Sequence, residues 1–209
     1  MNKQIDKQNP DEFILDGIVY SLKALRQEWE TPPEIFRQLD DEIRFGVDVA
    51  ANASNKKRPY FYGPGSRLST NALALDVWGN NIPVNGMIGG VAVSPVNCFC
   101  NPGFGDPLPW HIRAARTARE FGTTVVVVGL VGASQAWYEF AHLHSTEHRK
   151  MSPRPEYVPP VELVEYWNAN NIKRSGNNRE GCAYFYGPKE DLNMPAITRL
   201  WKWKDGVVI

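Results

Sequence analysis

The sequence predicts an α/β fold with a mainly parallel open sheet and helices on both faces. Residues Thr123–Leu130 form a continuous apolar run, typical of a strand covered on both sides, as in a parallel sheet. The order strand–helix–strand from Val91 to Leu130 is typical of a βαβ unit. In such sheets ligands bind beyond the carboxyl ends of the strands, so the residues that follow each strand are the first candidates for a functional site.

Length and charge narrow the class of protein. The 209 residues suit one domain, and 43% of them are apolar, enough for a substantial core. Lysine and arginine total 23, as do aspartate and glutamate, so the net charge is zero. This balance argues against a polybasic binder but leaves room for a local basic cleft. The longest apolar run is far shorter than the ~20 residues of a membrane span, so no membrane partner is expected.

The cysteines and the N-terminus bear on location. Three cysteines and a polar Met1–Pro10 segment, with no apolar leader, favour a reduced protein in the cytoplasm, which for a viral protein is the host cytoplasm. Cys98 and Cys100 are two residues apart, so in a strand both side chains lie on one face.

The first elements are a mobile end at Met1–Pro10, a short strand around Phe13–Tyr20, and a helix that starts near Thr31. There Thr31 is a candidate cap, Pro32 suits the first helical position, and Glu34 completes a T-x-x-E capping box. Four apolar residues then share one helix face: Ile35, Phe36, Leu39 and Ile43.

The remaining elements follow from apolar runs and from glycine and proline breakers. Expected strands are Arg44–Ala51, Val91–Cys100, Thr123–Leu130, Val161–Trp167 and Cys182–Tyr186. A helix is expected over Trp110–Phe121, ended by Gly122. Expected loops are Asn52–Thr70, Gly79–Gly90, Asn101–Pro109 and the polar, proline-rich His142–Pro160.

The tetrapeptide Asn101-Pro102-Gly103-Phe104 carries the most chemistry. An asparagine oxygen beside a backbone carbonyl offers two acceptors for the two N–H protons of an exocyclic amino group, and proline fixes the turn between them. An aromatic ring two residues later offers a face on which a flipped base can stack. The alternative is a simple Pro-Gly turn after a strand, with Phe104 in the core.

The chain resembles the phage-type DNA N6-adenine methyltransferase family over about Trp29–Pro188. Matching segments occur in family order: Thr31-Pro32 with Ile35-Phe36, Phe45–Ala51, Asp76-Val77-Trp78, Phe99–Phe104, Val125–Leu130 with Trp137-Tyr138, and Gly181–Pro188. Phe99–Phe104 is similar to the family's catalytic Asn-Pro-Pro-Tyr/Phe segment, and Phe45–Ala51 to its Asp-x-Ala-Ala segment.

The resemblance implies a Rossmann-like class I methyltransferase that transfers a methyl group from S-adenosylmethionine to N6 of adenine in double-stranded DNA, in a phage or restriction-modification setting. Residues 1–28 would form an extension and 29–209 a single domain. Asn101, Pro102 and Phe104 would be catalytic. Six residues would contact the cofactor: Thr31, Pro32, Asp48, Ala50, Ala51 and Asp76. A turn residue at Asp48, a surface residue at Asp76 and a helix cap at Thr31 are the respective alternatives.

Two departures from the family pattern bear on activity. Gly103 replaces the second proline of the catalytic segment, which frees the backbone beside the acceptor pair. The chain also lacks a Gly-x-Gly loop after its first strand, so Ala50-Ala51 would have to leave room for the cofactor instead.

Basic residues are the candidates for phosphate contact, although such clusters are also common on solvated faces. They are Lys56, Lys57, Arg58, Lys173, Arg174 and Arg179. Residues 142–160 and 168–180 are candidate target-reading loops. Ser134 and Trp137 are candidates for lining the pocket, with Trp137 also a core candidate.

Three alternatives remain open at this point. The spacing of His142, His144 and His148 invites a zinc site, but no Cys-x-x-Cys pair accompanies it, so no metal is expected. The same acceptor pair also suits methylation of cytosine N4, RNA adenine or a protein glutamine. A catalytically silent nucleic-acid-binding module is the third alternative, motivated by Gly103 and by the missing glycine loop.

Overall fold

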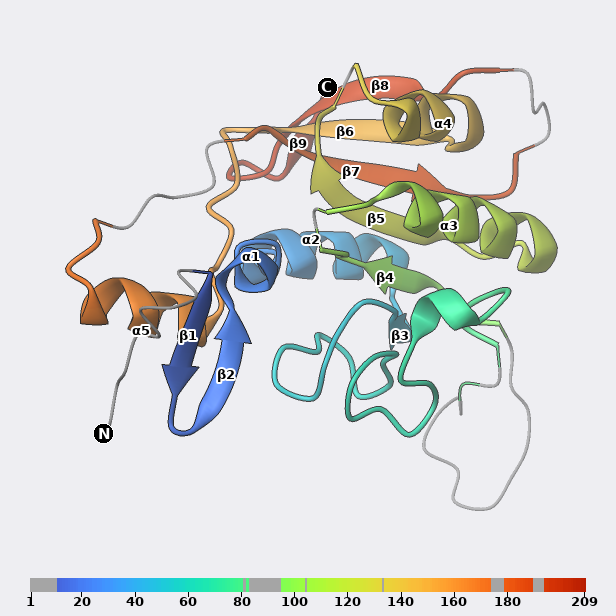
Figure 1. The fold of residues 1–209 in the computed structure, drawn as a ribbon. Helices are drawn as coiled ribbons and strands as arrows, with labels where there is room; N and C mark the ends of the chain where they lie inside the picture. Colours follow the sequence, from blue (N-terminus) through green and yellow to red (C-terminus); the bar gives the residue numbers. More distant parts are fainter. Residues whose placement is uncertain are drawn as a thin grey trace.

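A seven-stranded mixed sheet forms the centre of the computed structural model, which describes residues 11–80, 82, 95–103, 105–132, 134–173, 179–189 and 194–209 (Figure 1). The spatial order is β3 (Val47–Asp48), β4 (Cys98–Cys100), β5 (Val125–Leu130), β7 (Gly181–Tyr186), β6 (Glu147–Ser152), β8 (Ile197–Lys202) and β9 (Val207–Val208). Strands β3, β4 and β5 are parallel, whereas β7 is antiparallel to both of its neighbours.

The expectation of a mainly parallel sheet is therefore only half right. β6 and β8 are parallel and β9 is antiparallel to β8, so half of the neighbouring pairs run each way. A continuous apolar run indicates that a strand is covered on both faces, but it does not indicate the direction of the neighbouring strands. β5 has a parallel strand on one side and an antiparallel strand on the other.

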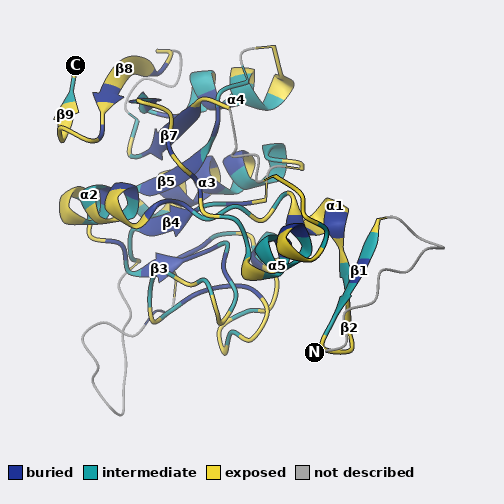
Figure 2. Cartoon of the chain, turned by 90° about the vertical axis from the view of Figure 1, so that its left-hand side faces the viewer, coloured by how far each residue is buried: buried dark blue, intermediate teal, exposed yellow. Residues whose placement is uncertain are grey.

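Helices cover both faces of the sheet, as expected. Val125 and Val127 of β5 belong to the core under α3 (Leu108–Phe121) and α4 (Ala136–His144), and Val126 and Val128 belong to the core under α2 (Pro33–Ile43). Cys98 and Cys100 share the first of these faces, which confirms the period-2 prediction. Figure 2 shows β3, β4, β5 and β7 as the buried centre of the molecule.

A third small core lies beside the sheet and joins two distant parts of the chain. The hairpin β1 (Glu12–Leu15) and β2 (Ile18–Ser21) leads into α1 (Leu22–Leu25), and these pack against α5 (Val161–Ala169) through Phe13, Leu22, Leu25, Leu163 and Trp167. The strand predicted at Val161–Trp167 is thus wrong: the apolar residues Leu163 and Trp167 are four apart and face the hairpin from one side of a helix.

Two further expectations are wrong. Residues 142–160 are not one loop, because they contain the end of α4 and all of β6. The capping box at Thr31 does not form, because α2 begins at Pro33 with Pro32 in the cap position and without a side-chain cap. The Thr31 side chain is fully buried instead, and its Oγ1 has no hydrogen-bond partner among the described residues.

Other predicted features are confirmed. Ile35 and Leu39 are the buried face of α2. Gly122 ends α3 in the left-handed conformation, with φ of 65°. The segment between β3 and β4 is irregular apart from a short 3-10 turn, η1 (Ala72–Ala74), over the described residues. No helix in the described part of the chain is long and apolar enough to cross a membrane.

Candidate functional site

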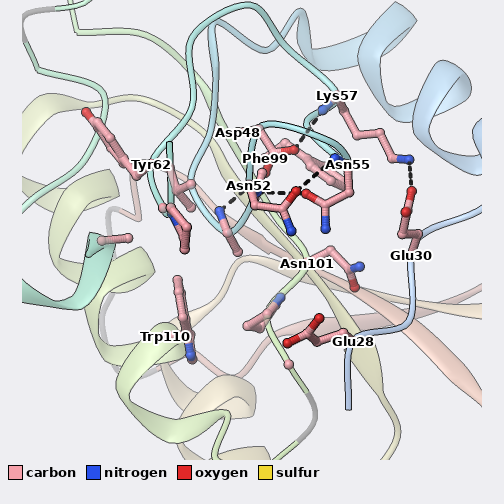
Figure 3. Close-up of a pocket in the computed structure, with 18 of the residues that line it drawn as sticks. Glu28, Glu30, Asp48, Asn52, Asn55, Lys57, Tyr62, Phe99, Asn101 and Trp110 are labelled. Carbon is pink, nitrogen blue, oxygen red and sulfur yellow. Dashed lines mark hydrogen bonds and ion pairs between the residues drawn. The ribbon is translucent and has the colours of Figure 1, made fainter. Parts of the chain in front are cut away.

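A cavity of about 260 Å³ opens at the carboxyl ends of the parallel strands β3 and β4. Figure 3 shows Asn101, Glu28 and Trp110 around one side of it and Asp48, Asn55 and Lys57 around the other. The lining comes from five parts of the chain: Gln27–Glu30, residues 48–57, residues 62–72, residues 99–103 and Trp110. The cavity thus brings together Asp48, Ala50, Ala51, Asn101 and Pro102, which the sequence assigned to one site.

Asn101 has a fixed amide with one unused acceptor. Its Nδ2 donates to the main-chain oxygen of Trp29 at 2.7 Å. Because only the amino end of the amide can donate to a carbonyl, this bond fixes which end is Oδ1. That oxygen is buried and accepts no hydrogen bond from any described residue. Leaving a buried acceptor unpaired costs about 1–3 kcal/mol, and such groups in a folded protein are candidates for a functional role.

Asp48 organises the loop that follows β3. It is only 2% exposed, and its Oδ1 accepts from the backbone N–H of Ala50 at 3.3 Å and its Oδ2 from that of Lys57 at 3.0 Å. Burial raises the pKa of this carboxyl to about 6, against the lowering effect of the two backbone N–H groups. The side chain therefore holds residues 50 and 57 of this loop together beside the cavity, and its carboxylate is poorly solvated.

Asp48 makes stability depend on pH. Its folded-state pKa lies above its usual value, so the folded protein binds this proton more tightly, and the contribution of Asp48 to stability must fall as pH rises from about 4 to about 6. We expect that contribution to fall by about 3 kcal/mol across this window, on the basis of the roughly two-unit shift. Urea unfolding of the wild type and of Asp48→Asn at several pH values measures it as the difference between the two proteins. A difference in the free energy of unfolding that stays constant from pH 4 to pH 6 would contradict the assignment.

Charge in this cavity is mostly negative. Among the lining residues Glu28, Glu30 and Asp48 are acidic and Lys57 is the basic one, and Lys57 Nζ forms an ion pair with Glu30 at 2.7 Å. Burial, followed by repulsion from Glu162, raises the pKa of Glu28. A cavity of this kind suits a ligand that carries positive charge.

Two of the three basic residues at 56–58 have partners in the fold. Lys57 is paired as described, and Arg58 donates from Nε to the main-chain oxygen of Phe45 and from Nη2 to Asp40, each at 2.6 Å. Lys56 is exposed, with its ammonium 4.9 Å from the centre of the Phe61 ring. Arg58 therefore ties the loop to α2, and Lys56 is the member of the run best placed for a phosphate contact.

Arg58→Ala should lower the free energy of unfolding by about 2 kcal/mol, because it removes two charge-assisted hydrogen bonds. Lys56→Ala should leave stability unchanged, and if Lys56 contacts a phosphate, as the sequence predicts, the substitution should reduce the salt dependence of nucleic-acid binding by about one phosphate contact. Thermal unfolding and binding titrations at several salt concentrations measure both. The opposite pattern, with Arg58 governing the salt dependence, would refute this division of roles.

The other predicted residues are dispersed. Asp76 lies outside the cavity, where its exposed carboxylate pairs with Arg113 at 3.0 Å and Arg116 at 3.2 Å. Thr31 is buried next to the lining residue Glu30, and Lys173 is exposed after α5. Phe104 and Arg174 lie outside the described residues.

A second cavity, of about 540 Å³, adjoins the first on the β5 side. Pro102 and Gly103 line both cavities. The rest of the second lining comes from the loop before α3, from His111, from the end of β5 and the start of α4, and from Arg179. Ser134 and Trp137 are part of it, as the sequence suggested.

Gly103 has room for a side chain. A Cβ built on it would meet Gln27 at 3.7 Å, an ordinary contact distance, and its backbone is not in the left-handed region. Gly103→Ala should therefore fold normally and gain up to about 1 kcal/mol in stability through the unfolded chain. Chemical unfolding measures the gain, and a loss of more than about 1 kcal/mol would show that glycine is required there.

Sequence reasoning missed the segment Gln27–Glu30, which supplies one wall of the first cavity and the partner of Asn101. The contribution of Trp29 is a main-chain oxygen, and no side-chain pattern signals that. His111 was also missed, because one histidine in an amphipathic helix gives no local signal of a cavity.

One family model matches the chain. The model described as DNA N-6-adenine-methyltransferase (Dam) matches residues 20–181. The matched range includes Asn101 of the first cavity and the two residues that line both cavities, Pro102 and Gly103. No curated protein and no solved structure matches the chain.

Proposed function

The chain belongs to the DNA N-6-adenine-methyltransferase family, and from that premise we propose that it transfers a methyl group from S-adenosylmethionine to N6 of adenine in double-stranded DNA. The observation that carries the proposal is the buried, unpaired Oδ1 of Asn101 at the end of β4. An exocyclic amino group supplies the donor that this oxygen lacks.

The first cavity fits the donor of the methyl group. It lies beyond the carboxyl ends of two parallel strands, where α/β proteins bind nucleotides, and its acidic residues suit a cation. S-adenosylmethionine supplies a methyl carbon made electrophilic by a positively charged sulfur. Asp48, Ala50 and Ala51 are the residues that we propose hold it, on the loop that Asp48 itself closes. On this proposal the fold is Rossmann-like.

The chain's own residues position the target nitrogen. Asn101 Oδ1 and the main-chain oxygen of Pro102 each accept one N–H of the amino group, which aims the nitrogen lone pair away from them and toward the donor. Trp29 holds the amide in the orientation that presents Oδ1. A neutral amine needs no strong base for attack, so most of the rate acceleration comes from holding the reacting atoms in line.

Incubation with methyl-labelled S-adenosylmethionine and unmethylated duplex DNA of mixed sequence tests the proposal. Mass spectrometry of the digested product should find the label in N6-methyladenine. RNA of the same sequence and duplexes without adenine are the matched controls. Label in N4-methylcytosine, in RNA or in the protein itself would replace this proposal with another, and no label in any acceptor would refute it.

A further inference from the structure

We propose that the second cavity receives the extruded target base and that His111 reads a ring nitrogen next to its amino group. This inference rests on the proposed function and extends it to how the base is chosen. It assigns a specificity role to a buried side chain in the first turn of α3.

The position of the second cavity, next to the first, favours it as the binding site of the target base. Pro102 and Gly103 form part of both linings, so a group held at the Pro102 carbonyl can face the first cavity while the ring attached to it occupies the second. If the donor fills the cavity beyond β3 and β4, the base has to approach from the β5 side. The volume of about 540 Å³ lies within the range of small-molecule sites.

His111 is held rigidly at the wall of this cavity. The residue is 1% exposed, and its ring stacks on Trp137 with centroids 5.2 Å apart and planes 12° from parallel. The ring of Tyr184 meets it edge-on at 5.0 Å. Such packing leaves the imidazole one orientation, as a reading group requires.

The hydrogen bond to Tyr186 decides which nitrogen of His111 carries the proton. Nδ1 lies 2.6 Å from the Tyr186 hydroxyl, which is buried and has no other acceptor among the described residues. Burial, with repulsion from His148, lowers the pKa of His111 to about 3, so the ring is neutral at physiological pH. If Nδ1 held the proton, the tyrosine proton would be left without a partner. Tyr186 therefore donates to Nδ1, and Nε2 carries the hydrogen.

Nε2–H is then a donor available to the cavity. It forms no hydrogen bond with a described residue. The two ring nitrogens of His148 are unpaired and fully buried, whereas His111 Nε2 is not among the fully buried unpaired atoms of the described residues, so it keeps access to the cavity. Asn101 accepts and His111 donates, which complements the edges of adenine, where an amino donor stands beside a ring-nitrogen acceptor. Guanine and hypoxanthine present an oxygen where Asn101 requires a donor.

The kinetic test compares three variants on three substrates. The variants are His111→Leu, which lacks a donor; His111→Gln, which keeps an N–H; and Gln38→Leu, a polar-to-leucine change in α2, outside both cavities. The duplexes contain adenine, 7-deazaadenine or 1-deazaadenine. We expect the wild type to lose about tenfold to a hundredfold in kcat/KM on one of the two analogues. His111→Leu should lose as much on adenine and no longer distinguish that analogue, His111→Gln should recover part of the loss, and Gln38→Leu should behave as wild type.

Two results would overturn the inference: methylation of both analogues at the rate of adenine by the wild type, or methylation of adenine within twofold of wild type by a folded His111→Leu variant. Circular dichroism establishes that each variant is folded.

A second readout needs no methylation. With ¹⁵N-labelled histidine, NMR should show His111 as the Nε2–H form from pH 5 to 8, and Tyr186→Phe should reduce that preference. Adding free adenine should shift the Nε2 resonance, and hypoxanthine should shift it less. The Nδ1–H form, or equal shifts with both bases, would refute the reading role. A selective shift without methylation of any substrate would instead refute the proposed function while supporting the base site.

Discussion

Asn101→Ala should reduce methyl transfer at least about a hundredfold while the protein stays folded. The expected size follows from other enzymes, in which loss of one positioned hydrogen-bonding group at the reacting atoms costs two to three orders of magnitude. The effect on stability should be small, because the substitution removes one hydrogen bond to Trp29 but also removes an unpaired buried oxygen. Single-turnover kinetics together with urea unfolding measure the two effects separately.

Gln38→Ala is the matched control for Asn101→Ala. Gln38 Nε2 also donates to a main-chain oxygen, that of Trp203 at 2.6 Å, but it lies in α2, outside both cavities. It should keep full activity. An Asn101→Ala variant that retains more than a tenth of wild-type turnover would remove Asn101 from the catalytic role.

Gly63→Ala should destabilise the protein by about 3 kcal/mol or more and weaken cofactor binding with it. Gly63 has φ of 137°, and a Cβ added there would lie only 1.8 Å from the main-chain oxygen of Ala51. Neither the backbone conformation nor the contact tolerates a side chain. Both residues line the first cavity, so the loops that move apart are those proposed to hold the donor.

Gly105→Ala is the control for Gly63→Ala, because a Cβ at Gly105 would meet no described atom within 4 Å and the backbone is not left-handed. Thermal unfolding and calorimetry with S-adenosylmethionine measure stability and binding. Equal stability of the two variants would show that the close approach of Gly63 and Ala51 is not required.

Sequence periodicity predicted the parts of the fold in which one face or both faces are clearly apolar. β5 is apolar throughout and central, and α3 ends at a glycine, so both were found. β6 was missed because its side chains Glu147, Arg149 and Lys150 are charged. Arg149 is buried and makes ion pairs with Glu42 and Glu147, and neither the burial nor the pairing is visible along the chain.

The candidate site was predictable where it lies at strand ends. Asp48 and Asn101 follow neighbouring parallel strands, so topology alone brings them together. The ion pairs of Asp76 and Arg58 could not be predicted, because a charged residue in the sequence does not reveal its partner: Asp76 pairs with Arg113 and Arg116, and Arg58 with Asp40. Trp29 reaches Asn101 from 72 residues away through its backbone, a contact that only the tertiary structure shows.

The partition formed by Pro102 and Gly103 has a thermodynamic consequence. Because the same two residues line both cavities, a ligand in one cavity would contact the wall of the other, so each ligand would change the affinity for the other by an equal factor. The target base would then bind most tightly when the positively charged methyl donor occupies the first cavity. Conversion of the donor to its uncharged thioether product would weaken the binding of the methylated DNA.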